Sequence, residues 1–88
     1  MNIICNGIEY NCETFAYSLF LDILDTHLAN LECGEDMSAE DIYDMLTAAI
    51  ASLVFNKARN GEMNGRDAYF VGQSANGFVY EMFKQDLG

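Results

Sequence analysis

Six carboxylate side chains cluster within residues 32–44, more closely than any other chemically reactive groups of this sequence. Such a group can bind a metal ion, stabilise a helix N-terminus, or compete with phosphates for a basic surface. The segment lacks the D-x-D-x-D-G spacing and the distal glutamate of a calcium loop, so we expect no metal ion and no cofactor. The other two roles remain open. In the simpler of them, the acids stabilise the helix N-terminus and keep the protein soluble, without binding a partner. The six carboxylates are Glu32, Glu35, Asp36, Glu40, Asp41 and Asp44.

The single histidine and the three cysteines offer little for catalysis. His27 follows Ile23 by one helical turn on the apolar side of a predicted helix, which favours a core or interface side chain. As a general base it would need Cys12 or Cys33 beside it, and the six residues to Cys33 neither support nor exclude such a dyad. No G-x-S-x-G, Walker, G-x-G-x-x-G or H-E-x-x-H sequence is present. We therefore predict that the chain is not an enzyme.

The net charge of −10 is unevenly distributed along the 88 residues. Residues 1–56 hold ten acids and no lysine or arginine, whereas the four acids and four bases of residues 57–88 cancel. Direct binding to nucleic acid or anionic lipid is disfavoured, because nothing in the first part can displace counterions from phosphates. A basic protein partner is favoured for the same reason.

The cysteine pattern and the hydropathy predict a cytoplasmic protein with reduced thiols. Cys5, Cys12 and Cys33 are odd in number and form no C-x-x-C pair, and no cation lies beside them in sequence. We interpret them as small buried side chains. The first residues lack the basic and apolar regions of a signal peptide, and no stretch approaches the ~18 apolar residues of a membrane span.

The chain begins with a predicted β-hairpin and a predicted helix. Asn6-Gly7 is a strong two-residue hairpin turn between residues 3–5 and 8–10. From Asn11 or Cys12 to Leu31 runs a helix whose apolar surface is wider than one core requires. Either the fold surrounds this helix or a second copy covers part of it, and we favour a homodimer because so small a chain has few elements to cover it.

A second helix carries the clearest start and stop signals. Ser38 is the predicted N-cap, with Met37 packing on Ile42 as a hydrophobic staple, and Asn60-Gly61 is the predicted left-handed end. A loop of residues 32–36 is short enough to make this helix the antiparallel neighbour of the first. The predicted buried face comprises Ile42, Met45, Leu46, Ala49, Ile50, Leu53 and Val54.

The C-terminal residues have two possible structures, and the fold class depends on which of them forms. An apolar stripe favours a helix over residues 74–87, despite Gly72 and Gly77, and leaves residues 66–73 open. Alternatively, residues 69–71 and 78–80 are strands of a C-terminal hairpin, which would make the chain α+β. We predict a single domain over residues 1–88 that is mainly α, with an antiparallel helix pair, an N-terminal β-hairpin and a C-terminal helix.

These observations predict a small acidic interaction protein that blocks the basic, nucleic-acid-binding surface of a partner protein. In being short, strongly acidic and free of catalytic motifs, the chain is similar to phage-encoded inhibitors of CRISPR or restriction systems, and that resemblance implies partial DNA mimicry in the host cytoplasm. The alternative is a structural or regulatory homo-oligomer with no nucleic-acid-related role. Tyr43, predicted opposite the apolar stripe, completes the candidate partner-binding residues: Asp22, Asp25, Glu32, Glu35, Asp36, Glu40, Asp41, Tyr43 and Asp44.

Overall fold

The computed structural model describes residues 1–31 and 38–87, with residues 28–31 and 86–87 described by their backbone only. A two-stranded hairpin precedes three helices, which confirms the predicted mainly α fold with an N-terminal β-hairpin. The elements are β1 (Asn2–Cys5), β2 (Ile8–Asn11), α1 (Cys12–Leu31), α2 (Ala39–Arg59) and α3 (Gly65–Leu87).

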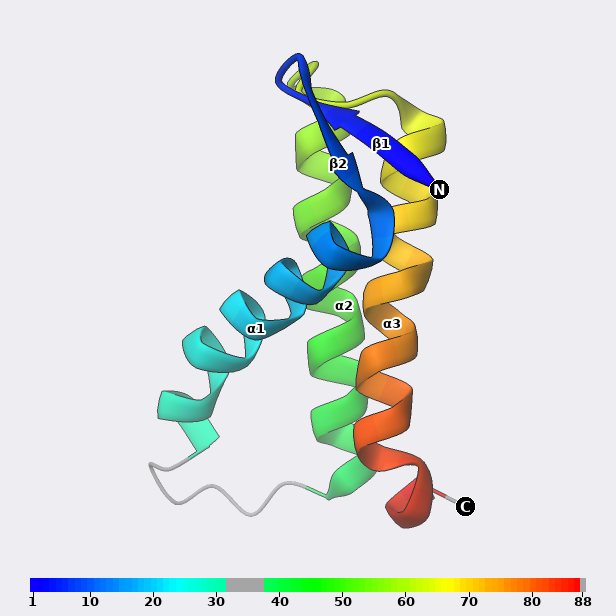
Figure 1. Ribbon diagram of the computed structural model, residues 1–88. Coiled ribbons are helices and arrows are strands. Elements are labelled where there is room, and N and C mark those ends of the chain that lie inside the picture. Colours follow the sequence, from blue (N-terminus) through cyan, green and yellow to red (C-terminus); the bar gives the residue numbers. More distant parts are fainter. Residues whose placement is uncertain (32–37, 88) are drawn as a thin grey trace.

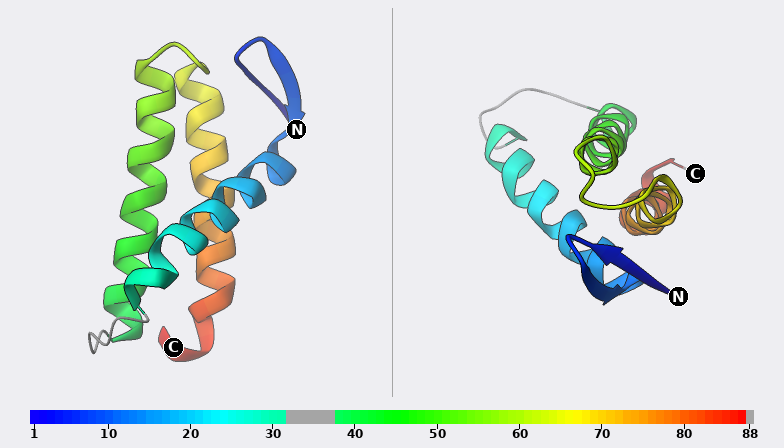
Figure 2. Two further views of the ribbon diagram at one scale, coloured as in Figure 1. Left: turned by 90° about the vertical axis from the view of Figure 1, so that its left-hand side faces the viewer. Right: turned by 90° about the horizontal axis from the view of Figure 1, so that it is seen from above.

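The antiparallel pair is formed by α2 and α3 rather than by α1 and α2. Helices α2 and α3 lie side by side along their length, and α1 crosses one face of the pair obliquely (Figures 1 and 2). Contacts of α1 with α3 are more extensive than those with α2. The short link at 60–64 holds α2 and α3 together, and the oblique path lets α1 cover both of them.

The hairpin forms where the Asn6-Gly7 signal predicted it. The strands are antiparallel, with Cys5 opposite Ile8. Asn6 and Gly7 have φ of 53° and 79°, the left-handed values that a two-residue turn of type I′ requires. Alternation along β1 buries Ile3 and Cys5 against the helices.

Helix α2 ends in a Schellman motif. The N–H of Glu62 donates to the carbonyl of Lys57 at 2.9 Å, and the N–H of Gly61 donates to that of Ala58 at 3.1 Å. Only Gly61 takes the predicted left-handed conformation, with φ of 78°, whereas Asn60 has φ of −83°. The motif turns the chain sharply into the link before α3.

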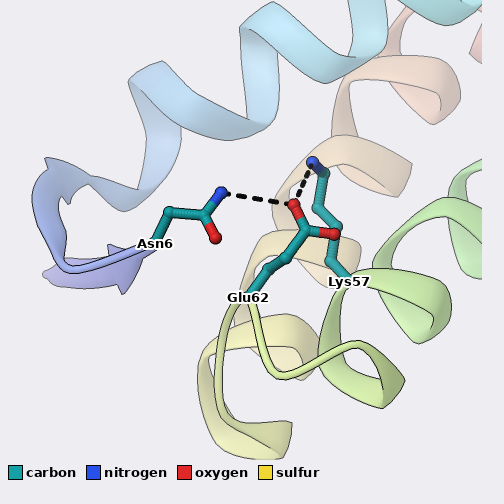
Figure 3. A network of polar contacts seen from close by, with 3 residues as sticks. All are labelled: Asn6, Lys57 and Glu62. Carbon is teal, nitrogen blue, oxygen red and sulfur yellow. Dashed lines mark hydrogen bonds and ion pairs between the residues drawn. The ribbon is translucent and has the colours of Figure 1, made fainter.

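The hairpin turn is tied to this end of α2, as Figure 3 shows. The backbone N–H of Asn6 donates to the Glu62 carbonyl at 2.7 Å, and the Asn6 amide donates to the Glu62 carboxylate at 3.2 Å. The same carboxylate lies 3.8 Å from the ammonium of Lys57. Residues 56 positions apart in the sequence are thereby held in one polar cluster.

Asp67 fixes β1 to the start of α3. Its carboxylate accepts the backbone N–H of Ile4 at 3.1 Å, and the residue is only 8% exposed. Its own N–H donates to the side chain of Asn64 at 2.7 Å, so Asn64 caps α3 while Asp67 reaches the strand.

Replacing Asp67 with alanine is expected to destabilise the fold by about 1–3 kcal/mol, because the Ile4 N–H loses its acceptor in a partly buried site. Asp67→Asn keeps an acceptor and should lose less. Urea unfolding of the two variants measures the difference. Equal stability of Asp67→Ala and the unmodified chain would show that this contact contributes nothing.

Helix α2 begins as predicted at the Ser38 cap. The Ser38 hydroxyl accepts the N–H of Asp41 at 3.2 Å, and its carbonyl accepts the N–H of Ile42 at 3.0 Å. The predicted staple falls on Met37, which lies outside the described residues. The predicted apolar face is confirmed: Leu46, Ile50 and Val54 are buried, while Ile42, Met45, Ala49 and Leu53 are partly buried against them.

The C-terminal region is one continuous helix, so residues 66–73 are helical and the alternative hairpin is wrong. Helix α3 approaches α2 closely at Gly72, where an added Cβ would lie 3.4 Å from a methyl of Val54. Phe78 is partly buried and Met82 is exposed, at the margins of the predicted stripe. The buried residues of the stripe are Ala68, Val71, Ala75, Val79 and Phe83.

Gly77→Ala is expected to stabilise the protein by about 0.5–1 kcal/mol, because Gly77 is an exposed residue inside α3 and no heavy atom lies within 4 Å of an added Cβ. Gly61→Ala is the matched control. Its Cβ also meets open space, but its positive φ makes the substitution destabilising. Thermal unfolding should therefore move in opposite directions for the two variants, and a shift in the same direction would contradict this account.

Helix α1 is partly covered by the α2–α3 pair. Ala16, Leu19, Phe20 and Ile23 are buried, whereas Tyr17 and Leu21 remain 47% and 42% exposed. The Tyr17 ring still packs edge-on against Phe78, with centroids 5.1 Å apart. The wide apolar surface of α1 therefore serves mainly the core of one chain.

Candidate functional site: the acidic surface

The structure places five of the predicted carboxylates on the surface. Asp22 and Asp25 of α1 and Glu40, Asp41 and Asp44 of α2 are all exposed, and we call these five residues the acidic surface. Glu32, Glu35 and Asp36 lie outside the described residues.

The carboxylates of the acidic surface form no ion pair among the side chains that the structure describes. Within residues 1–27 and 38–85 the ion pairs are Lys57 with Glu62, at 3.8 Å, and Lys84 with Glu81, at 2.8 Å. Hydrogen bonding to Glu81, reinforced by its charge, raises the pKa of Lys84. Both pairs lie within residues 57–88, and neither includes a carboxylate of the acidic surface.

The acidic surface is extended rather than gathered at one point. Asp22 lines a hollow of about 520 Å³ between α1 and α2, where it shares the lining with His27, Asn56 and Lys57. The α2 residues of this lining run from Ala49 to Lys57, which lie about 7–20 Å along the helix axis beyond Asp44. Asp22 therefore lies beside the middle of α2 rather than beside its first turn, and a partner would have to contact both helices to meet all five acids.

Two of the three acids of α2 also stabilise the helix that carries them. Glu40 and Asp41 lie in its first turn, where the positive end of the helix dipole and the unpaired N–H groups favour negative charge. This contribution is about 0.3–1 kcal/mol per residue at exposed positions. Helix stability alone thus accounts for acids at these positions, without requiring or excluding a partner.

Tyr43 does not lie opposite the apolar stripe, and that prediction is corrected. The side chain is partly buried and packs against the core. Tyr43 precedes Leu46 by three residues and Ile50 by seven, so helical geometry places it at the margin of the same buried face. It borders the acidic surface without projecting from it.

Cys12 and His27, a candidate thiol–imidazole pair, are far apart in the structure. Cys5 and Cys12 are buried free thiols, as expected, and the Cys12 sulfur lies 3.9 Å from the Ser74 hydroxyl. Cys12 starts α1, whereas His27 lies fifteen residues further, about 22 Å along the axis. Cys33 is outside the described residues. Among the side chains of residues 1–27 and 38–85, no three or more His, Cys, Asp or Glu residues are grouped so that they could hold a metal ion.

Sequence reasoning missed an exposed apolar face on the other side of the molecule. Phe55 of α2 is 64% exposed and Tyr69 of α3 is 60% exposed, beside a hollow lined mostly by small residues. The spacing of Ala48, Ala51, Phe55 and Ala58 carries the signal, because steps of three and four residues mark one face of a helix.

Comparisons of the chain with protein families, with curated proteins and with solved structures found no match. Across the part of the chain that the structure describes, none of the helices combines the length and apolar character needed to cross a membrane.

Proposed function

We propose that this protein is an interaction module whose acidic surface binds the basic, nucleic-acid-binding surface of a partner protein and blocks it. The observation that carries the proposal is the segregation of charge. Five exposed carboxylates lie on α1 and the first turns of α2 without a paired cation among the described residues, and the chain has no lysine or arginine before Lys57.

The local charge density supports competition with nucleic acid. Glu40, Asp41 and Asp44 fall within about 6 Å of helix axis, which approaches the one charge per ~1.7 Å of duplex DNA. The surface is too short to imitate a long duplex, so it suits the centre of a basic groove. Its field would steer the encounter and orient the two proteins, while apolar contacts would slow dissociation.

The resemblance in charge and size to phage-encoded inhibitors of CRISPR or restriction systems supports the proposal that the partner is a nucleic-acid-binding protein of the host cytoplasm. The reduced thiols Cys5 and Cys12 are consistent with that compartment.

The proposal is tested by capture from a nuclease-treated bacterial lysate on the immobilised full chain. We expect a retained protein that binds nucleic acid, and we expect its retention to fall steeply as salt is raised, because exposed charges are screened. Retention that does not depend on salt, or retention only of proteins without nucleic-acid-binding activity, would contradict the proposal.

A further inference from the structure

The face of the α2–α3 pair that is turned away from α1 carries a hollow of about 590 Å³, which we call the outer groove. Its walls are mostly small residues, and Phe55 and Tyr69 stand at its margin. Among the large apolar side chains that the structure describes as exposed, Phe55 has the highest exposed fraction. The lining from α2 is Ala51, Val54, Phe55 and Ala58.

No described helix or strand covers this face. Ala49, Leu53 and Lys57 line the hollow on the α1 side of α2. At 100° per residue, Ala51 points about 160° and Phe55 about 120° away from Ala49, toward the other side. The end-on view in Figure 2 agrees: α1 and the hairpin lie on one side of the α2–α3 pair and no other element lies opposite.

The exposed stripe of α2 on this side changes character along the helix. It begins with the acids Glu40 and Asp44, continues with the small residues Ala48 and Ala51, and ends with Phe55 and Arg59. All six residues are exposed. Steps of four, four, three, four and four residues keep them on one side of the helix. One end of the stripe is therefore acidic, the middle is flat, and the other end carries an aromatic ring and a guanidinium.

This pattern is complementary to itself when reversed. Residues 40 and 59, 44 and 55, and 48 and 51 are equidistant from the midpoint of the stripe. When a second α2 is laid antiparallel across the first, Arg59 of one copy meets Glu40 and Asp44 of the other. Phe55 then lies opposite Asp44 of the second copy, with its side chain tilted toward its own helix N-terminus and so toward Ala48, while Ala48 and Ala51 of the two copies oppose each other at the centre. The same contacts recur in both directions, as a two-fold interface requires.

We propose that the occupant of this face is a second copy of the chain, bound through antiparallel α2 helices related by a two-fold axis between Ala48 and Ala51. The small residues let the two helix backbones approach, and Phe55, next to the outer groove, supplies the apolar burial. Charge sets the antiparallel direction, because a parallel pair would bring the acidic ends together.

The inference goes beyond the proposed function and differs from the sequence-based expectation that a second copy covers α1. Glu40 and Asp44 serve both proposals, so a basic partner and a second copy compete for them. Asp22 and Asp25 lie on α1, away from this interface. The charge reversals that test capture change Asp22, Asp25 and Asp41. Because Asp41 lies beside Glu40 and at the same angular position on α2 as Arg59, dimerisation of this variant is measured by sedimentation alongside its capture, and the two proposals are judged on separate readouts.

Sedimentation equilibrium of the full chain provides the first test. We expect the unmodified chain to dimerise and Phe55→Ala to remain a monomer at the same concentration. Leu21→Ala is the matched control, since Leu21 is an exposed apolar residue of α1, and it should dimerise like the unmodified chain. A monomeric unmodified chain overturns the inference, as does a dimer that Leu21→Ala dissociates and Phe55→Ala does not.

Charge exchange provides the second test, with urea unfolding to confirm that each variant is folded. Arg59→Glu should raise the dimer dissociation constant by about tenfold or more, because symmetry places each substitution in the interface twice. Glu40→Arg with Asp44→Arg should do the same. Combining all three substitutions in one chain should restore the dimer. A combined variant as weak as its components would overturn the antiparallel register.

Discussion

Reversing Asp22, Asp25 and Asp41 to lysine is expected to weaken capture of the partner by about 100-fold. Each reversal adds two charges, so the net charge falls in magnitude from −10 to −4. At up to ~1 kcal/mol per exposed ion pair, the loss of three attractive contacts amounts to about 3 kcal/mol. All three side chains are exposed, so the fold should survive.

The matched control reverses Glu9, Glu13 and Glu81, which are exposed acids away from the acidic surface. This variant also has a net charge of −4, so the comparison separates the position of the charge from its amount. Titration calorimetry with the captured partner measures both affinities. Equal weakening in the two triple variants would show that only the overall charge matters, and the acidic surface would lose its assigned role.

Ile50→Ala is expected to give the largest loss of stability, about 2–5 kcal/mol. Ile50 is 0% exposed and lies in the middle of α2, within the core shared by the three helices. Truncation removes apolar contacts and leaves a cavity that the surrounding helices can fill only in part. A chain of 88 residues has a total stability of about 4–13 kcal/mol, so this single change removes a large share of it.

Ser52→Ala is the control for this prediction, because Ser52 is exposed on the same helix. We expect its stability to change by no more than about 0.5 kcal/mol. Urea unfolding followed by circular dichroism measures both variants. A loss below about 1 kcal/mol for Ile50→Ala would mean that the core is not packed at this position as described.

Local signals in the sequence were sufficient for most element boundaries. The Asn6-Gly7 turn, the Ser38 cap and the positive φ of Gly61 each depend on the chemistry of one or two residues and their immediate neighbours. The periodicity of α2 also predicted its buried face, because Leu46, Ile50 and Val54 follow helical spacing. These features need no knowledge of the other elements.

The arrangement of the elements depends on contacts between distant residues, which the sequence does not display. From the sequence alone, Asp67 would be expected to be an ordinary exposed acid. In the structure its carboxylate accepts the Ile4 N–H. The open segment 66–73 becomes helical because Asn64 caps it and Gly72 packs closely on Val54. Tyr43 was misplaced because its position at the margin of the apolar face was taken for the opposite side.

The candidate site was likewise predictable in its local features and not in its spatial arrangement. The sequence offered the acids as candidate binding residues, and the structure finds the five residues of the acidic surface exposed, as charged side chains usually are. Their arrangement could not be predicted, since it depends on α1 crossing the α2–α3 pair (Figure 1), where Asp22 lines the same hollow as Ala49 and Lys57. The apolar face at Phe55 was not predicted, because one phenylalanine among alanines is a weaker sequence signal than the wide apolar surface of α1.

The central claim is that this protein occupies a basic surface that its partner otherwise uses for nucleic acid. Fluorescence anisotropy of a labelled DNA duplex bound to the captured partner measures this directly. The account predicts that added protein releases the duplex, and that the variant with Asp22, Asp25 and Asp41 reversed does so about 100-fold less effectively. A duplex that stays bound while this protein also binds the partner would contradict the claim.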